Sequence, residues 1–374
     1  MPDSHMGTTH VQKLRYDGRI GALYWIFIKI VLLNIVTLTI YRFWGKAQLR
    51  RYVWSHMQLQ GERLEYTGTG LELFLGFLLV IGLFSLFYAG IFLGALLFGQ
   101  ESALGTVLHL ILPFFLIYLP MVAIYAAQRY RLTRTLWRGI RGGMTGSAWT
   151  YGFRALGYSL LVAVTAGLAT PWAQMRLAEQ RFNNSYFGDA KASLQASSKP
   201  VYKAFFLGFI TYVVLMALLL AALYNIFDVG TLFARLSHPG GGQADPEQMA
   251  RMAWLFFAAY LCVILGAAII GVFAFSWYAA SFFKAIAAGL RFDNLTFRSA
   301  MGALDYFRFW LGNILILAVT LGIGLPIIVH RSLRFFADRL EIIGEIDIER
   351  LKQNTLPKPR TGEGLLETFD AGFW

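Results

Sequence analysis

Residues 73–98 read LFLGFLLVIGLFSLFYAGIFLGALLF and contain no charged side chain. A helix needs about 20 apolar residues to cross the hydrocarbon core of a bilayer, and this run exceeds that length. Further apolar runs lie at residues 22–41, 106–127, 155–172, 204–227, 252–280 and 309–329. The sequence therefore predicts a protein of the all-α class, a polytopic helical membrane protein with four to seven membrane segments.

The composition of the chain supports this class. Of the 374 residues, 57% are hydrophobic and only 14% are charged, whereas soluble domains carry about 25% charged residues. This excludes an ordinary soluble domain and a disordered chain. The net charge of +12 favours an anionic membrane surface over nucleic acid, because no nucleic-acid-binding module accompanies it. A single cysteine, Cys262, excludes an internal disulfide and a multi-cysteine metal site.

The number of crossings follows from the distribution of Lys and Arg. The runs 22–41, 155–172 and 309–329 are short or contain polar residues such as Lys29 and Asn313. If all seven runs cross, the two sides hold 20 and 12 basic residues; if only the four strong runs cross, the split is 30 to 2. The second model, in which the weak runs re-enter or lie in the interface, obeys the positive-inside rule better. Both models place the C-terminus in the cytoplasm.

The three weak runs end in a similar way, which predicts an internal repeat. Thr37, Thr165 and Thr320 each close an apolar stretch. A Trp follows seven residues later in the first two copies, as Trp44 and Trp172. A Pro follows at position +6 in the last two copies. Alternatively, any apolar helix that ends in interfacial Trp and Arg anchors would look alike.

The stretch from Thr37 to Tyr52, together with residues 59–69, resembles the YjgN-like family of bacterial inner-membrane proteins. The resemblance covers about residues 14–352 and implies a multi-pass protein of the inner (cytoplasmic) membrane. It implies no activity, substrate or cofactor. The third copy departs from the pattern, since Ile327 replaces the Trp and Val329 replaces the Lys; this copy is expected to matter less for any function of those residues.

These observations predict three parts of the chain. Residues 1–13 form a disordered N-terminus. Residues 14–352 form a membrane domain of repeats, with copies at about 14–127, 128–280 and 281–352. Residues 353–374 form a flexible cytoplasmic tail that contains Pro357, Pro359 and several glycines.

Aromatic and basic residues follow the weak runs and are our candidates for binding lipid. An indole ring favours the headgroup layer, and a guanidinium can bind phosphate through two parallel hydrogen bonds. Arg131, Arg134, Arg138 and Arg141 would form one cationic stripe if that stretch is helical. Alternatively, these charges only hold the loop inside. The complete set of candidates is Trp44, Lys46, Arg50, Arg51, Arg131, Arg134, Arg138, Trp172, Arg176 and Arg181.

Two function classes remain open. Motifs of hydrolases, phosphate-binding loops and zinc proteases are absent, and no carboxylate lies inside an apolar run, which argues against proton coupling. We expect a non-enzymatic protein without cofactor or metal that binds anionic membrane lipids, or that organises a membrane process with membrane-protein partners, at its basic cytoplasmic face. The alternative is a transporter or channel for a small anionic solute, which the repeats would also suit.

Overall fold

The fold is taken from a computed structural model, which describes residues 11–99, 103–227, 246–344 and 350–353. The chain divides into two compact units. The sheet unit comprises residues 1–197, 284–300 and 320–374, and the helical unit comprises residues 198–283 and 301–319. The two units are described separately.

All eleven strands of the sheet unit form one antiparallel sheet of short strands. Its order is β1-β11-β10-β9-β8-β7-β6-β5-β4-β3-β2. The strands are β1 (Val11–Lys13), β2 (Arg15–Tyr16), β3 (Met57–Leu59), β4 (Glu62–Tyr66), β5 (Thr135–Trp137), β6 (Ile140–Met144), β7 (Ser185–Phe187), β8 (Ala190–Leu194), β9 (Leu290–Phe292), β10 (Leu295–Ser299) and β11 (Leu340–Ile343).

The first segment of the described chain closes this sheet into a ring. β1 and β2 are separated by Leu14 alone and act as one bent strand. Its first half pairs with β11, in the register Gln12↔Ile342, and its second half pairs with β3, in the register Arg15↔Gln58. The two outer strands of the sheet order are therefore consecutive pieces of one strand, which leaves the ring without long free edges.

The interior of the ring is packed with apolar side chains. Trp137, Leu295 and Ile342 are each at most 2% exposed and form one cluster. Other strands add Leu14, Leu59, Leu64, Phe187, Phe292 and Phe297. Because side chains from most of the strands meet in this cluster, the ring has a filled core and no open lumen at this level.

The topology places the two kinds of connection at opposite edges of the sheet. Four hairpin turns join β3–β4, β5–β6, β7–β8 and β9–β10. Gln60 and Gly61, and likewise Arg138 and Gly139, have positive φ angles of 50° to 80°, as expected for two-residue turns of type I′. The other strand ends lead into helices, so the helices leave from the edge opposite these turns.

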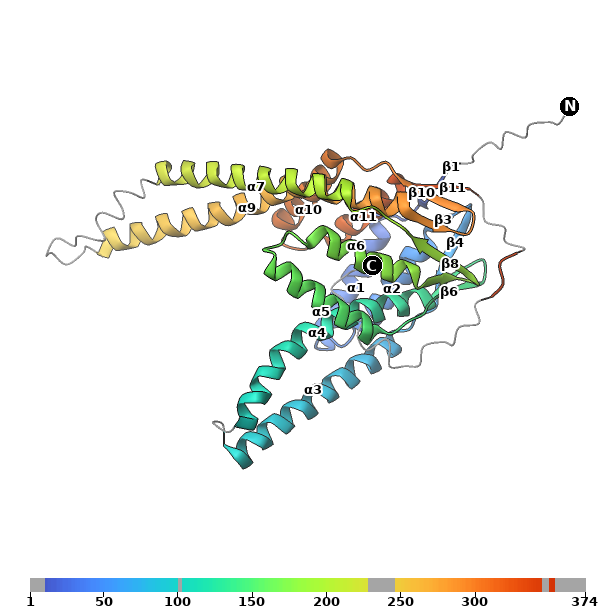
Figure 1. Cartoon of the computed structure of the whole chain (residues 1–374), viewed down its shortest axis with the longest axis horizontal. Coiled ribbons are helices and arrows are strands. Elements are labelled where there is room, and N and C mark those ends of the chain that lie inside the picture. The colour runs from blue at the N-terminus through green and yellow to red at the C-terminus, as the bar shows by residue number, and fades with distance from the viewer. Residues whose placement is uncertain (1–10, 100–102, 228–245, 345–349, 354–374) are drawn as a thin grey trace. The chain divides into compact units, whose positions relative to one another are not determined.

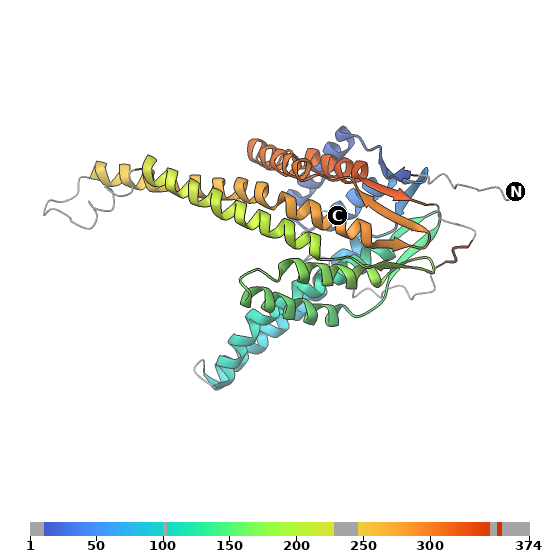
Figure 2. The ribbon, with the colours of Figure 1, turned by 45° about the horizontal axis from the view of Figure 1, so that its top comes forward.

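The sheet unit carries two short helical hairpins, one long one and the helix α11. The helices are α1 (Ile20–Val36), α2 (Arg42–Ser55), α3 (Gly70–Phe98), α4 (Ala103–Thr133), α5 (Ala148–Val164), α6 (Thr170–Asn183) and α11 (Leu325–Arg339). α3 and α4 run side by side away from the strands (Figures 1 and 2). In the first short hairpin, a Cβ on Gly45 of α2 would lie 2.7 Å from the Ile30 side chain of α1, so glycine permits this close packing.

The helical unit consists of α7 (Lys199–Ile226), α9 (Pro246–Gly289, of which its last residues belong to the sheet unit) and α10 (Ala303–Thr320). α7 and α9 run alongside each other in both ribbon views (Figures 1 and 2). The backbone of Ala274 lies directly against Gly208, where no side chain fits. Within the described residues, three segments are long and apolar enough to cross a membrane: Lys199–Ile226, Met249–Gly289 and Ala303–Thr320.

The predicted all-α class with four to seven membrane segments is wrong. An eleven-stranded sheet organises the protein, and the described part of the chain contains three candidate spans. The weak runs 22–41 and 155–172 are not continuous helices, because α1 ends at Val36 and α5 ends at Val164. The strands were missed because each has five residues or fewer and lies between much longer apolar helices.

The chain ends of the described part also differ from expectation. Val11–Lys13, assigned above to a disordered N-terminus, form β1, whereas residues 1–10 lie outside the described residues. Leu351 packs against the ring interior. The backbone of Lys352 exchanges hydrogen bonds with Asp189, and the Gln353 side chain binds the backbone of Gly139 and Arg141. Residues 351–353 therefore tie together the turns of β5–β6 and β7–β8. The tail beyond residue 353 lies outside the described residues.

Candidate membrane-binding site

A threonine organises the turn at the end of each short helical segment. The Thr37 hydroxyl donates to the carbonyl of Leu33 at 2.6 Å and accepts from the backbone N–H of Tyr41 at 2.9 Å. It thus spans the five residues that separate α1 from α2. The hydroxyl satisfies a backbone donor that the end of α1 and the start of α2 leave without a helical partner.

The other two turns use threonine in the same place. The Thr165 hydroxyl donates to the carbonyl of Leu161 at 2.8 Å and accepts from the Ala169 N–H at 3.1 Å. The Thr320 hydroxyl accepts from the Gly324 N–H at 2.9 Å. Each turn is thus bridged by a hydrogen bond from position +4 to the threonine hydroxyl.

The backbone of all three turns is left-handed at the two positions that follow the threonine. The φ angles are 50° and 71° at Leu38 and Thr39, 48° and 90° at Ala166 and Gly167, and 48° and 93° at Leu321 and Gly322. Left-handed backbone costs a non-glycine residue about 1–2 kcal/mol. Positive φ angles at all six positions therefore indicate that the three turns reverse the chain in one defined way.

The side chains at these turns are apolar and uncovered. Leu38, Val164 and Leu321 are 83%, 85% and 90% exposed. Exposed apolar surface costs about 25 cal/mol per Å² relative to burial. Exposed apolar side chains at three separate tips indicate that an apolar medium covers these tips.

The candidate residues of the first copy lie in different surroundings. Trp44 is 36% exposed, and its ring packs 5.6 Å from that of Phe74. Lys46 is half-buried, whereas Arg51 is exposed and donates to the carbonyl of Gly68 at 2.9 Å. Arg50 is only 1% exposed and donates to the Tyr66 hydroxyl at 3.3 Å. A lipid headgroup can reach Trp44, Lys46 and Arg51, but Arg50 lies on the buried face of α2.

None of the three candidates in the predicted second copy is buried. The Trp172 ring packs edge-on against Tyr158, with 4.8 Å between the centroids. The Arg176 side chain is 55% exposed and pairs with Glu179, one turn further on, at 2.8 Å. Arg181 is half-buried near the end of α6. Trp172 and Arg176 therefore lie near the start of a helix that directly follows an apolar tip.

The cationic stripe expected at residues 131–141 does not form. α4 ends at Thr133, and the chain then makes the β5–β6 hairpin. Arg131 lies in the last turn of α4, Arg138 lies at the hairpin turn, and Arg141 lies in β6. The periodicity of three and four residues suggested a helix, but Gly139 with its positive φ permits a tight turn there.

Arg134 instead connects the start of α3 to the end of α4, the two long helices of the sheet unit. Its Nε and Nη2 atoms each donate to the Glu72 carboxylate at 3.0 Å, and the Tyr130 hydroxyl donates to the same carboxylate at 2.7 Å. Burial raises the pKa of Glu72, but the hydrogen bonds from Arg134 and Tyr130 outweigh burial and hold that pKa below its usual value. Arg134 thus has a partner within the protein.

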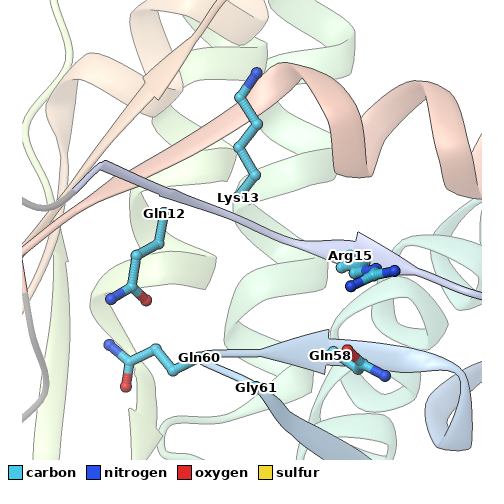
Figure 3. A pocket seen from close by; sticks show the side chains of 6 residues that line it. All are labelled: Gln12, Lys13, Arg15, Gln58, Gln60 and Gly61. Carbon is cyan, nitrogen blue, oxygen red and sulfur yellow. The ribbon is translucent and has the colours of Figure 1, made fainter.

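Sequence reasoning missed a cavity of 430 Å³ beside the bent N-terminal strand. Figure 3 shows the amides of Gln12 and Gln60 pointing into the gap between β1 and the β3–β4 turn. The gap arises because β2 pairs with β3 but β1 turns away to β11. In the sequence, only the glutamines at positions 12, 58 and 60 indicate a polar site. No group of three His, Cys, Asp or Glu side chains that could hold a metal occurs in the described ranges.

Residues 11–368 match a family described as bacterial protein of unknown function, DUF898. The chain belongs to this family. The inner membrane protein YjgN of Salmonella typhimurium (strain LT2) is 24% identical over 380 residues, which cover 93% of this chain and 92% of that protein. The resemblance stated from the sequence is thus confirmed. No solved structure matches.

The comparison and the fold together define the class of the protein. The relative is an inner membrane protein, and the described chain contains three apolar helices of spanning length. The protein is therefore a membrane protein of an uncharacterised family. The description of the family states no function.

Proposed function

We propose that this is a non-enzymatic, multi-pass protein of the inner membrane, which binds anionic phospholipids where its short helical hairpins enter the cytoplasmic leaflet. The observation that carries the proposal is the set of three exposed apolar tips, at Leu38, Val164 and Leu321, each followed by a second helix. α7 and α9 cross the bilayer in this proposal, α10 enters the cytoplasmic leaflet and leads to the third tip, and the sheet and the C-terminus lie in the cytoplasm.

The charges on the short hairpins limit how deeply they can insert. On α5, Arg154 precedes Thr165 by eleven residues, a helical length of about 16 Å at 1.5 Å per residue. The hydrocarbon core is about 30 Å thick. The second hairpin therefore reaches about the middle of the bilayer and returns. The twelve residues from Arg308 to Thr320 give about 18 Å for α10, which leads to the third tip.

The first hairpin inserts less deeply. Lys29 is exposed eight residues before Thr37, and Arg42 follows the tip directly. The Arg42 guanidinium lies 4.8 Å and 4.7 Å from the ring centroids of Phe43 and Phe77. Its apolar stem and these rings can enter the interface while the charge stays near the phosphates.

The threonine hydroxyls make such insertion feasible. Backbone that is not helical survives at membrane depth only where its polar groups have partners. At the second tip, Thr165 supplies an acceptor for the Ala169 N–H, and the Thr170 hydroxyl donates to the Gly167 carbonyl at 2.6 Å. The turn thus carries internal hydrogen bonds that lipid cannot provide.

The residues after each tip supply the lipid contacts. Trp44 and Trp172 lie seven residues after their threonines, where an indole ring suits the headgroup layer. Lys46, Arg51 and Arg176 follow at the depth of the phosphates. Arg131, Arg138 and Arg181 add positive charge to the same cytoplasmic side in this proposal, and each basic residue near an anionic surface adds about 1 kcal/mol of attraction.

We further infer that the two short hairpins and the segment from α10 to α11 are copies of one repeated unit. The support is the shared threonine and the two left-handed residues that follow it in each copy. The proposed copies, at about 14–127, 128–280 and 281–352, each begin near a strand that leads into a short hairpin. A transporter would also suit a repeat, but the packed interior of the ring offers no passage through the sheet.

The test measures retention of lipid by the purified full-length protein. We expect Lys46→Gln with Arg176→Gln to weaken binding of phosphatidylglycerol vesicles about 30-fold at low salt, from two residues at about 1 kcal/mol each. The difference should shrink as salt screens the charges. The charge-matched control is Lys191→Gln with Arg291→Gln, two exposed residues on β8 and β9.

Arg334→Gln tests the third copy, which lacks the Trp. Its effect should be smaller than that of Arg176→Gln. If the control pair weakens binding as much as Lys46→Gln with Arg176→Gln, attraction is a property of the net charge alone and the proposed site is wrong. A protein-dependent flux of anionic solute into proteoliposomes would favour the transporter instead.

A further inference from the structure

A second cavity, of 560 Å³, lies at the edge of the sheet from which the helices leave. Its size falls within the range of about 300–1,000 Å³ that is typical of small-ligand sites. The residues that line it are Lys284, Ala288, Arg298, Ser299, Ala300 and Glu341. All of them belong to the sheet unit.

The alternation of the strands places the charged groups on the outer face of the ring. On β10, Leu295 and Phe297 belong to the interior cluster, so Arg298 points outward. On β11, Ile342 is 2% exposed in the same interior, so Glu341 points outward. Arg298 and Glu341 are register partners, and Lys284 lies in the last turns of α9.

These three charges converge without neutralising one another. Within the residues that the structure describes, no ion pair within 4.0 Å joins Lys284 or Arg298 to Glu341. Two cations and one carboxylate around one cavity suit a ligand that carries both an anion and a cation. The guanidinium of Arg298 can bind two phosphate oxygens, and the carboxylate of Glu341 can accept hydrogen bonds from an ammonium group.

We propose that this cavity binds a phosphoethanolamine group, with the phosphate at Lys284 and Arg298 and the ammonium at Glu341. The inference rests on the membrane insertion of the proposed function, because the cavity must lie near the headgroups if its ligand is a lipid. Residues 252–283 of α9 contain no charge, and Lys284 lies about 10 Å along the helix beyond Trp277. An indole at the interface therefore places Lys284 at the level of the phosphates.

The wild-type protein provides the first test. Full-length protein in detergent is offered phosphatidylethanolamine, phosphatidylcholine and phosphatidylglycerol, and the bound lipids are counted by native mass spectrometry. The three methyl groups of choline remove the N–H donors that Glu341 would accept from. We expect at least tenfold preference for phosphatidylethanolamine over phosphatidylcholine, and equal retention of the two lipids would overturn the proposal.

Substitutions then separate the two ends of the ligand. Glu341→Gln should lower retention of phosphatidylethanolamine about tenfold and leave phosphatidylglycerol unchanged. Arg298→Gln should lower both. Arg291→Gln, an exposed arginine on the neighbouring strand β9, is the matched control and should lower neither. If Glu341→Gln reduces both lipids equally, the carboxylate does not recognise the ammonium and the assignment is wrong.

Soluble glycerophosphoethanolamine distinguishes a lipid from a free ligand. One outcome is that glycerophosphoethanolamine competes with the lipid for the wild-type protein but not for the Glu341→Gln variant. In that case the cavity recognises the headgroup alone, and a soluble molecule can be its ligand. If it does not compete but the lipid preference holds, the ligand is the lipid. This measurement is made in detergent and does not use the hairpin tips. The failure of either proposal therefore leaves the other one testable.

Discussion

Glu72 holds together the two helices that leave the sheet unit as its long hairpin. It lies in the first turn of α3, where the Thr69 hydroxyl accepts a hydrogen bond from its backbone N–H. Its carboxylate receives two hydrogen bonds from Arg134 and one from Tyr130, both on or beside the end of α4. The side chains of Glu72 and Arg134 are 28% and 14% exposed, so this pair is more shielded from water than a surface ion pair.

We predict that Glu72→Gln lowers the free energy of unfolding by about 1–3 kcal/mol at neutral pH, because a shielded guanidinium loses its carboxylate partner. The lowered pKa of Glu72 means that the wild type gains this stability above the pKa of the unfolded chain, about 4.3, and loses it as the pH falls through the folded-state value. Thermal unfolding in detergent, followed by tryptophan fluorescence, measures the difference, which should shrink in acid.

Glu62→Gln is the matched control. Glu62 lies 3.9 Å from Arg138 and its side chain is 56% exposed, and such surface pairs contribute about 0–1 kcal/mol. Equal losses for the two variants, or a Glu72→Gln loss that does not change with pH, would contradict this account.

Thr165 gives a second prediction at this scale. Thr165→Val keeps the branched shape but removes the hydroxyl that bridges Leu161 and Ala169. We expect faster amide hydrogen exchange across residues 165–170 and a loss of about 1–2 kcal/mol, because a backbone N–H loses its partner. Thr165→Ser should restore slow exchange. If the valine variant exchanges as slowly as the wild type, the hydroxyl does not hold the turn.

At the scale of elements, the short hairpins make the sharpest prediction. In a Cys262→Ser background, Val164→Cys lies at an uncovered tip and Arg176→Cys lies one helix further on. If the tip enters the bilayer, an impermeant maleimide should not label Val164→Cys from either side of a proteoliposome, although Val164 is 85% exposed in the protein alone. Arg176→Cys should react from the cytoplasmic side only.

A fluorophore at Val164→Cys should also be quenched by lipids brominated along their acyl chains. Labelling of Val164→Cys by the impermeant reagent, from whichever side, would show that water covers the tip and would contradict insertion.

The elements also show what the sequence could predict and what it could not. Long apolar helices such as α7 follow directly from composition, because some 20 uncharged residues have few alternatives. The threonine turns were visible as recurring residues at 37, 165 and 320, but their left-handed backbone was not, since Leu38 and Leu321 are unusual there. Strands of three residues, such as Met57–Leu59, are too short for their residue pattern alone to predict a strand.

One strand signal was nevertheless present. The turn Gln60-Gly61 is followed by Glu62, Arg63, Leu64, Glu65 and Tyr66, of which the last four alternate between charged and apolar residues. That pattern is typical of a hairpin. The residues of the 560 Å³ cavity could not be brought together by sequence reasoning, because Lys284, Arg298 and Glu341 come from three elements. Their proximity depends on the pairing of β10 with β11.

At the scale of the whole molecule, residues 351–353 fasten the ring at its turn edge. Leu351 fills part of the interior, while Lys352 and Gln353 bind the turns at Asp189 and Gly139. We predict that a chain ending at Glu349 unfolds several degrees below the wild type, because about 2–3 kcal/mol of burial and hydrogen bonding is lost. A chain ending at Gln353 keeps these contacts and should unfold with the wild type.

Thermal unfolding in detergent compares the two truncations. If the chain ending at Gln353 is destabilised as strongly as the one ending at Glu349, the contribution comes from the residues beyond 353 and not from Leu351, Lys352 and Gln353.

The bent strand Val11–Tyr16 sets an order of events during synthesis. It precedes the other described strands in the chain, yet half of its partners lie in β11 at residues 340–343. At about 5–20 residues per second, translation of the intervening chain takes on the order of 15–65 s. Throughout that time the translocation machinery handles the apolar helices while Val11–Lys13 waits with an unpaired edge. The ring can close only when the last strand arrives, so a nascent chain stalled before residue 340 has apolar helices but no complete ring.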